Sequence, residues 1–416
     1  MFIGWPRCIV CIDMNAFFAS IEQLLQPKLR KKPIAITNGS HGSCVITASY
    51  PARAYGVKTG MRFSFARILC PAIIQVASRS AIYEAFSKKL MQILHDQFSP
   101  DIEVFSVDEA FLDMTNVYHG FTSPRALAKA IRDCVMKELS LPCSIGVSGD
   151  KTTAKYAAKL HKPRGISIIE PAISRQILAP VPVEALCGIG PGTKKYLSRF
   201  GATTCGSVGH IPVSVLSKKF GIKGQRLWLM CAGKDPDMVR SIIKPAQTMG
   251  HSKILPPGVT TSGLLLGYLD TMAFKLTYRM LLQHYHSDRF ICKIVSVKRA
   301  FYYELALDQP ICDYELLAQW LHQIGKRMVF NGAIKRVQIT ALDLTQCIQQ
   351  DLFNTILPAR SRPIETVVAS INQRFGQSAI LPARLGSLFK KVQSSNVISP
   401  SWKGAVPVKQ KNSIWD

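Results

Sequence analysis

The sequence predicts a multi-domain α+β protein, and three patterns indicate this class. Strand-like apolar runs alternate with helix-like stretches over residues 1–170, and short helical patterns broken by Gly and Pro follow over 171–240. Helix-like and strand-like segments return after a breaker-rich stretch at 243–263, which we expect to be a linker. With 416 residues the chain is long enough for three or more domains of about 100–200 residues each.

The N-terminal part begins with a strand that ends on an acid. Residues 8–12 form a continuous apolar run of strand length, and Asp13 follows it directly. Apolar residues at helical spacing over 17–25 predict a helix next, with Asn15 as its N-terminal cap. The predicted order is therefore strand, acid, helix.

A second acidic position lies much further along the chain. Apolar and aromatic residues on both sides of Asp108 and Glu109 predict two short strands that meet near this pair, within 101–114. The remaining patterns predict a strand over 143–148, a helix over 151–160, a turn over 161–165, a helix over 264–285, strands over 292–303 and 336–344, and a disordered Ser-, Pro- and Lys-rich tail over 395–416.

The charge balance points to a polyanionic partner. The formal net charge is +26, from 52 basic and 26 acidic residues, and every predicted domain is basic. A generally basic surface without a nucleic acid partner is the alternative. No apolar run approaches the roughly 18 residues of a membrane span, and the N-terminus lacks the small-residue cleavage site of a signal peptide. We therefore expect a cytoplasmic protein with no membrane partner.

The twelve cysteines are scattered singly through apolar stretches, which favours reduced core thiols over a disulfide framework. Cys8 and Cys11 do form a C-x-x-C pair. A zinc or redox role is disfavoured because no second ligand pair follows at finger-like spacing and because the pair lies in the predicted strand.

Three acids carry the most informative chemistry. Two-metal phosphoryl transfer requires oxygen ligands that hold two cations about 3.5–4 Å apart, and carboxylates that converge from separate strands provide them. Asp13, Asp108 and Glu109 are placed to converge in this way. Taken singly, Asp13 could be a helix cap, and Asp108 with Glu109 a solvated turn.

Four motifs then appear in one order. They are CIDMNAFFASIEQ at 11–23, CVITASYPARAYGVKTGM at 44–61, FSVDEAFLDM at 105–114 and SIGVSGDKTTAKYAAKLHKPRG at 144–165. In sequence and order they resemble the motifs of Y-family translesion DNA polymerases, and the DNA polymerase IV (DinB-like) branch more than the UmuC branch. The similarity extends through GIGPGT and MGHSKILPP to about residue 345.

The resemblance implies a right-hand polymerase architecture. Its parts would be a palm (1–14 and 80–170), fingers (15–79), a thumb (171–240), the start of a linker (241–246), a little finger (247–345) and a C-terminal region (346–416). The activity it implies is template-directed, error-prone DNA synthesis across damaged templates, by addition of dNTPs to a primer 3′ end. No segment resembles a proofreading exonuclease.

The resemblance also implies roles for single residues. Asp13, Asp108 and Glu109 would be catalytic and would hold two Mg²⁺ ions, together with the main-chain carbonyl of Met14. Phe18 would be the steric gate that excludes a 2′-hydroxyl, although Phe17 beside it has the same pattern and a core position is the alternative for Phe18.

Further residues would bind the two substrates. Those assigned to the dNTP are Phe17, Phe18, Tyr50, Arg53 and Lys162, with a solvated surface charge as the alternative for the two basic ones. Gly188, Gly190, Gly192 and Thr193 resemble a helix-hairpin-helix whose amides bind a DNA backbone phosphate. Three lysines at spacing four, Lys151, Lys155 and Lys159, predict a solvated helix face or phosphate contacts.

Residues 349–353, QQDLF, resemble the peptide by which bacterial polymerases dock on the sliding clamp, with Gln349, Leu352 and Phe353 as contacts. The implied partners are primer-template DNA, dNTPs and this clamp, and we expect a monomer. One alternative is a catalytically inactive paralogue that binds DNA and recruits partners. Another is a helix-hairpin-helix nuclease or repair protein, which leaves the first 170 residues unexplained.

Overall fold

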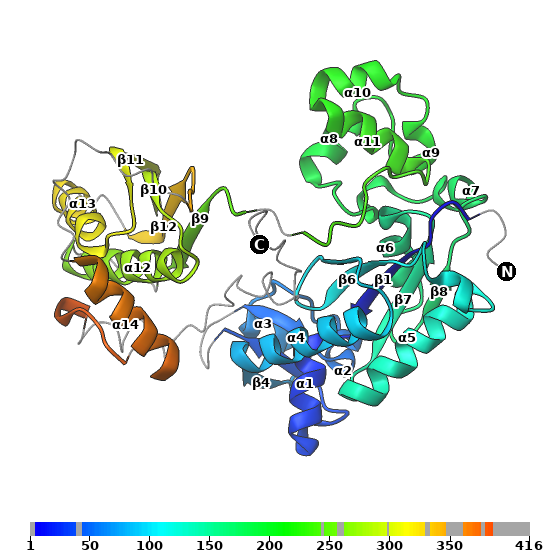
Figure 1. Ribbon diagram of the computed structural model, residues 1–416, viewed down its shortest axis with the longest axis horizontal. Coiled ribbons are helices and arrows are strands. Elements are labelled where there is room, and N and C mark those ends of the chain that lie inside the picture. Colours follow the sequence, from blue (N-terminus) through cyan, green and yellow to red (C-terminus); the bar gives the residue numbers. More distant parts are fainter. Residues whose placement is uncertain are drawn as a thin grey trace, which may run out of the picture. The chain divides into compact units, whose positions relative to one another are not determined.

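The computed structural model describes residues 5–38, 44–242, 245–255, 262–297, 299–328, 333–346, 361–375 and 379–385. The chain forms two compact units, and the boundary between them lies at residues 243 and 244. Figure 1 shows the elements of both, and each unit is described by itself. No helix in the described part of the chain is long and apolar enough to cross a membrane.

The first unit is built on a five-stranded sheet with the order β5-β6-β1-β7-β8. Strand β1 (Ile9–Met14) lies at its centre and is antiparallel to β6 and to β7. All six residues of β1 are buried, as its continuous apolar sequence predicts. The other strands are β5 (Ile102–Val104), β6 (Glu109–Asp113), β7 (Cys143–Ser148) and β8 (Ile166–Ile168).

Helices cover both faces of this sheet (Figure 1). One face packs against α1 (Phe17–Leu25), α4 (Ser80–Gln97) and α5 (Pro124–Leu139). The other packs against α6 (Lys151–Leu160), and the approach is so close that a Cβ on Gly146 would lie 2.1 Å from the Ala154 carbonyl oxygen. Glycine is therefore required at this point of β7.

The C-x-x-C pair lies across the sheet. Cys8 packs in the core under α4 and α5, whereas Cys11 packs under α6 on the opposite face. Burial raises the pKa of both thiols well above the usual range. The two thiols are therefore inert core groups, which confirms the sequence interpretation.

A second, three-stranded sheet with the order β3-β2-β4 follows α1 in the sequence. It has its own small core, to which Ala52, Phe63 and Ala66 of its helices contribute. Its elements are η1 (Pro27–Leu29), β2 (Ile34–Thr37), β3 (Val45–Ala48), α2 (Tyr50–Ala54), α3 (Phe63–Leu69) and β4 (Ile74–Ala77).

A small helical subdomain completes the first unit, and its core is separate from that of the sheet. This agrees with the short, Gly- and Pro-broken helical patterns of the sequence. Its elements are α7 (Ser174–Leu178), η3 (Val183–Ala185), α8 (Pro191–Ser198), α9 (Cys205–Val208), α10 (Val213–Phe220) and α11 (Ile222–Cys231). A short 3₁₀ turn, η2 (Tyr118–Gly120), lies between β6 and α5.

The second unit packs helices against a four-stranded antiparallel sheet with the order β11-β10-β12-β9. Its strands are β9 (Met249–Ile254), β10 (Ser287–Ser296), β11 (Ala300–Ile311) and β12 (Ile334–Leu342), and its helices are α12 (Ser262–Leu282), α13 (Tyr314–Arg327) and α14 (Ser361–Phe375), with a 3₁₀ turn η4 (Ala383–Leu385).

Two sequence predictions for this unit need correction, and one helix was not predicted. The stretch 243–263 is not all linker, because β9 lies within it and pairs with β12. The single strand predicted over 292–303 is in fact two, because this stretch contains the end of β10, the turn and the start of β11. Helix α13 was missed, although Asp313 caps it by accepting from the Leu316 amide at 3.0 Å. Leu385 is fully buried in the core of this unit, which therefore continues beyond residue 345.

Candidate active site

Strand pairing brings the three predicted acids together. In the β1–β6 ladder Asp13 lies directly opposite Glu109. The next amide along β1, that of Met14, donates to the Asp108 carbonyl oxygen at 2.9 Å. Residues that are far apart in the sequence thus become cross-strand neighbours at the end of the central strand.

The environment of these acids disfavours three separate negative charges. Burial, followed by the hydrogen bond to Glu109, raises the pKa of Asp13. Burial also raises the pKa of Asp108, and the nearby Glu109 charge adds to this. Burial opposes ionisation of Glu109 as well, but the hydrogen bond from Asp13 and the Lys155 ammonium lower its pKa overall. A bound cation would relieve the repulsion in this group.

Lysines and a serine contact these carboxylates. Lys162 forms an ion pair with Asp13, and Lys155 Nζ lies 2.6 Å from Glu109 Oε2. The Ser106 hydroxyl donates to Asp108 Oδ1 at 2.6 Å. Among the described residues no set of three His, Cys, Asp or Glu side chains has the geometry of a ready metal cage. The donor atoms are nevertheless carboxylate oxygens, which suit a hard divalent cation.

The predicted steric gate lies in the first turn of α1. Phe18 is nearly buried, and its ring stacks on Tyr83 of α4 with centroids 4.2 Å apart and planes at 12°. Phe17 packs against Phe18 with ring centroids 5.7 Å apart. Phe18 is therefore part of the core, as the alternative interpretation of the sequence holds, and it lies four residues beyond Met14 in the same core cluster.

Tyr83 is itself hydrogen-bonded to a buried carboxylate. Its hydroxyl donates to Glu22 Oε1 at 2.7 Å, and Arg79 Nε donates to the same oxygen at 2.9 Å. The Glu22 side chain is fully buried. The sequence motifs gave no indication of this network under the Phe18 ring.

Tyr50 and Arg53 lie together on α2. The Arg53 guanidinium lies 5.1 Å from the centroid of the Tyr50 ring, and its Nε donates to the Ala48 carbonyl at 2.9 Å. The Tyr50 hydroxyl is buried and has no hydrogen-bond partner in the described part of the chain. Asp13 is close enough to contribute to the raised pKa of Tyr50, after burial.

Asn15 does not cap α1, which corrects the sequence prediction. The N-cap position is Ala16, in a left-handed conformation with φ 44°, and no side chain caps this helix. Instead the Asn15 amide donates to Ser144 Oγ at 2.9 Å and accepts from the Arg164 amide at 2.7 Å. Asn15 thereby ties the 161–165 turn, which carries Lys162, to the end of β1.

The three lysines of α6 do not form one solvated face, which was one of the two readings of the sequence. Lys151 and Lys155 are buried, and Lys159 is exposed and only reaches the Ala185 carbonyl at 3.5 Å. Lys151 binds Glu103 Oε2 at 2.6 Å and Asp237 Oδ2 at 2.8 Å. The spacing of the lysines does not predict this burial, because it depends on the acids of other segments that lie against α6.

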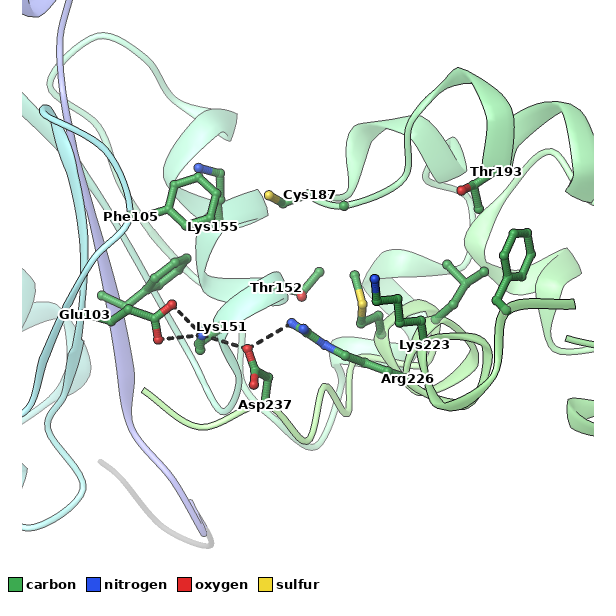
Figure 2. Close-up of a pocket in the computed structure, with 15 residues that line it drawn as sticks. Glu103, Phe105, Lys151, Thr152, Lys155, Cys187, Thr193, Lys223, Arg226 and Asp237 are labelled. Carbon is green, nitrogen blue, oxygen red and sulfur yellow. Dashed lines mark hydrogen bonds and ion pairs between the residues drawn. The ribbon is translucent and has the colours of Figure 1, made fainter. Parts of the chain in front are cut away.

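A pocket of about 460 Å³ opens between α6 and the helical subdomain, and Figure 2 shows the side chains that line it. Phe105 and Lys155 lie on one side, and Thr193 and Lys223 on the other. Arg226 contacts Asp237, which also binds Lys151 (Figure 2). The pocket is therefore lined by Lys155, which pairs with Glu109, and by Gly188 and Thr193 of the predicted helix-hairpin-helix.

The GIGPGT turn leads into α8 as predicted. Gly188 has φ +95°, a conformation that favours glycine, and Gly190 is the N-cap of α8. A Cβ on Gly190 or Gly192 would meet no atom within 4 Å, so the turn is open on that side. The predicted clamp residues Gln349, Leu352 and Phe353 lie outside the described residues.

Comparisons with known proteins agree with this geometry. The model of the impB/mucB/samB family matches residues 12–159, and that of the DNA polymerase-iota thumb domain matches residues 184–235. A solved Y-family DNA polymerase chimera has the same fold, with a TM-score of 0.71 and 24% identity over 81% of this chain and 99% of that one. The family models and the fold thus define a right-hand polymerase of the α+β class.

Curated relatives narrow the family assignment of the chain to one branch. DNA polymerase IV 2 of Mesorhizobium japonicum is 30% identical over 390 residues, which cover 89% of this chain and 92% of the relative. DNA polymerase IV 1 of Bacillus subtilis is 31% identical over 94% of this chain and 95% of the relative. The chain therefore belongs to the Y-family of DNA polymerases, in the DNA polymerase IV branch.

Membership of this family makes the chain a DNA-directed DNA polymerase that performs translesion synthesis, binds DNA and depends on a divalent metal. The match of relatives along nearly the whole chain leaves no room for the nuclease alternative. Because those relatives are polymerases, the comparisons also favour the active enzyme over an inactive paralogue.

Proposed function

We propose that Asp13, Asp108 and Glu109 are the catalytic carboxylates and hold two Mg²⁺ ions with the main-chain carbonyl of Met14. The observation that supports this most directly is the cross-strand pairing of Asp13 with Glu109 next to Asp108. One buried and two half-buried carboxyl groups, two of them with raised pKa values, form a set that a cation would stabilise.

The proposed reaction is attack of a primer 3′-hydroxyl on the α-phosphate of a dNTP, with release of pyrophosphate. When bound, the Mg²⁺ ions would neutralise charge on the reacting oxygens and on the leaving group. The protein would contribute the placement of the two substrates, since orientation and fixed charge account for much of catalysis in such sites.

The dNTP would lie against residues of α1, α2 and the 161–165 turn. Arg53 and Lys162 offer cationic donors for the triphosphate. The Tyr50 hydroxyl is a neutral donor that has no hydrogen-bond partner in the described residues. Phe18, with Phe17 behind it, would contact the sugar and exclude a 2′-hydroxyl. Lys162 would exchange its contact with Asp13 for one with phosphate.

The structural parts suit the domains of a right hand. The five-stranded sheet would be the palm (1–14 and 80–170), the small sheet the fingers (15–79), the helical subdomain the thumb (171–240) and the second unit the little finger, joined through a linker that starts at 241–246. Gly188, Gly190, Gly192 and Thr193 would bind the DNA backbone through the open turn before α8.

Three further expectations from the sequence stay predictions. They are a sliding clamp as partner for Gln349, Leu352 and Phe353, a monomeric state, and a cytoplasmic location. For the clamp, deletion of residues 349–353 should abolish stimulation of primer extension by the clamp while synthesis without the clamp is retained. Unchanged stimulation would remove this assignment.

The experiment that tests the proposed function is primer extension with Mg²⁺, with the wild-type chain compared to Asp108→Ala. We expect the substitution to lower the rate at least about a hundredfold, the scale of losing one preorganised group that stabilises the transition state. Asp133→Ala is the control, because Asp133 is an exposed acid on α5 whose ion pair in the described part of the chain is with its neighbour Arg132. Activity of Asp108→Ala equal to that of the control would refute the assignment.

A further inference from the structure

Lys155 is a buried cation beside the proposed metal site. It lies on the second turn of α6, its side chain is 7% exposed, and its Nζ lies 2.6 Å from Glu109 Oε2. On its other side the same ammonium lies 3.7 Å from the centroid of the Phe105 ring. The ammonium group is thus fixed between one carboxylate and one aromatic face.

Burying the Lys155 ammonium destabilises the fold unless its contacts compensate for the lost hydration. Removing an ammonium from water costs several kcal/mol, and one ion pair with one cation–π contact offsets this only in good geometry. A cation next to a metal ligand also opposes binding of a metal by simple repulsion. Stability alone is therefore a weak reason for a lysine at this place.

The contacts of Glu109 suggest what the lysine does. Glu109 Oε2 accepts from Lys155, and the Ser106 hydroxyl lies 3.4 Å from the same oxygen. The carboxyl group also shares a hydrogen bond with Asp13 on the neighbouring strand. Because the Ser106 hydroxyl donates its proton to Asp108 Oδ1 at 2.6 Å, Lys155 is the close donor to Glu109 Oε2, and with the Asp13 hydrogen bond it restricts the rotation of the carboxylate.

We propose that Lys155 is a positioning residue that holds Glu109 Oε2 and so orients the Glu109 carboxylate for the divalent cation. This rests on the proposed function of Glu109 as a metal ligand. Phe105, which is 40% exposed, covers the ammonium on the side of the pocket and keeps it directed at Glu109. Partners that orient a metal ligand in this way commonly change metal affinity or activity about 10- to 100-fold when removed.

The chain offers a matched control one turn earlier on the same helix. Lys151 is as buried as Lys155 and also forms ion pairs, at 2.6 Å to Glu103 and 2.8 Å to Asp237. It lies 5.4 Å from the Phe111 ring centroid, a second cation–π contact. None of its ion pairs involves Asp13, Asp108 or Glu109, so its loss should affect stability without affecting the metal site.

The experiment compares Lys155→Met, Lys155→Gln, Lys155→Arg and Lys151→Met with the wild-type chain. Mn²⁺ binding to each protein, in complex with primer-template and a non-hydrolysable dNTP analogue, is measured by the loss of the free Mn²⁺ signal in electron paramagnetic resonance. Primer extension gives kcat and the KM for dNTP, and thermal melting identifies any variant that does not fold.

We expect Lys155→Met and Lys155→Gln to bind Mn²⁺ about 10- to 100-fold more weakly and to lose kcat, with the dNTP KM and the DNA affinity unchanged. Lys155→Arg should restore part of both losses because it retains the charge. Lys151→Met should lower the melting temperature and leave Mn²⁺ affinity at the wild-type value.

Two results would overturn the positioning role. One is Mn²⁺ affinity in Lys155→Met equal to that of Lys151→Met, and the other is tighter Mn²⁺ binding, which would mean that Lys155 only competes with the metal. Asp108→Ala distinguishes failure of the positioning role of Lys155 from failure of the proposed metal site. If Asp108→Ala binds Mn²⁺ as the wild type does, the metal site itself is wrongly assigned, whereas if only the Lys155 variants behave as wild type, only the positioning role fails.

Discussion

The ring of Phe18 stacks on the ring of Tyr83, with centroids 4.2 Å apart and planes at 12°. Phe18 comes from the first turn of α1 and Tyr83 from α4, so the position of the Phe18 ring depends on two helices. Aromatic pairs in offset stacks add about 0.5–1.5 kcal/mol to the burial of their surfaces. The ring is therefore rigidly placed, as a steric gate for a sugar requires.

Phe18→Ala should raise the use of ribonucleotides relative to deoxyribonucleotides by about 10- to 200-fold, the range over which a pocket discriminates a small group. The measurement is the ratio of kcat/KM for rNTP and dNTP in primer extension. Phe18→Leu serves as a milder variant, since truncating a buried Phe to Ala costs about 3–5 kcal/mol. Tyr83→Leu, which removes the stacking partner but leaves Phe18, should change the ratio less. An unchanged ratio in Phe18→Ala would remove Phe18 from this role.

The charge network under Tyr83 should contribute strongly to stability. Glu22 is fully buried and accepts from Arg79 and from the Tyr83 hydroxyl. Glu22→Leu leaves the buried Tyr83 hydroxyl without its acceptor, while Arg79, 39% exposed, can turn to solvent. We expect a loss of about 3 kcal/mol in the free energy of unfolding, at the lower end for a broken buried pair.

Urea unfolding checks this value for Glu22. The control is Glu84→Ala on α4, which breaks an exposed pair with Lys88 one turn away. Such pairs contribute about 0.3–0.5 kcal/mol, so this variant should unfold nearly as the wild type does. Equal urea midpoints for Glu22→Leu and Glu84→Ala would contradict the importance of the network.

The second unit should lose stability in mild acid because of His251. Burial, and then the charges of Lys275, Arg279 and Lys253, lower the pKa of His251 to about 4. The unfolded chain, with an ordinary His pKa near 6.5, binds more protons than the folded chain between these two values. The contribution of His251 is therefore complete above about pH 6.5 and is lost as the pH falls to about 4, by up to about 3 kcal/mol.

Hydrogen exchange followed by mass spectrometry resolves this unit from the first one. Peptides of β9 and α12 should exchange faster at pH 5 than at pH 7.5, after correction for the intrinsic pH dependence of exchange. His251→Gln, which has no proton to gain, should reduce that difference, whereas His210→Gln in the exposed loop before α10 should not. A difference that persists in full in His251→Gln would refute the assignment.

The sequence is most informative where one residue pattern has one structural solution. The apolar run that ends at Asp13 became the central strand, and the acidic pair became a strand neighbour of it, because a buried strand must pair on both sides. Helix α6 was also predicted with its observed bounds, since Asp150 caps it and the 161–165 turn ends it.

The sequence is least informative where a side chain depends on what packs against its element. The lysines of α6 have the spacing of a solvated face, but two of them are buried, because acids from β5, β6 and the segment after α11 lie against the helix. Asn15 has the position of a cap, but its side chain is used by a loop that lies 149 residues further along the chain. Neither contact leaves a local signal.

Lys162 connects two steps of the proposed reaction, since the same ammonium that pairs with Asp13 would bind the triphosphate. A hydrogen bond to a charged group contributes about 1.5–3 kcal/mol, so Lys162→Ala should raise the KM for dNTP about 10- to 150-fold. Steady-state primer extension measures this KM. Arg53→Ala should raise it in the same way, because Arg53, which lies beside Tyr50 in the 44–61 motif, is the other cation proposed to bind the triphosphate.

The control for Lys162 is Lys159→Ala. Lys159 lies three residues earlier and carries the same charge, and its ammonium donates to the Ala185 carbonyl oxygen at 3.5 Å. A general loss of positive charge would weaken DNA binding equally in both variants and leave the KM for dNTP similar between them. A specific triphosphate contact requires a raised KM in Lys162→Ala alone, so equal values in the two variants would assign Lys162 to the surface charge of the protein.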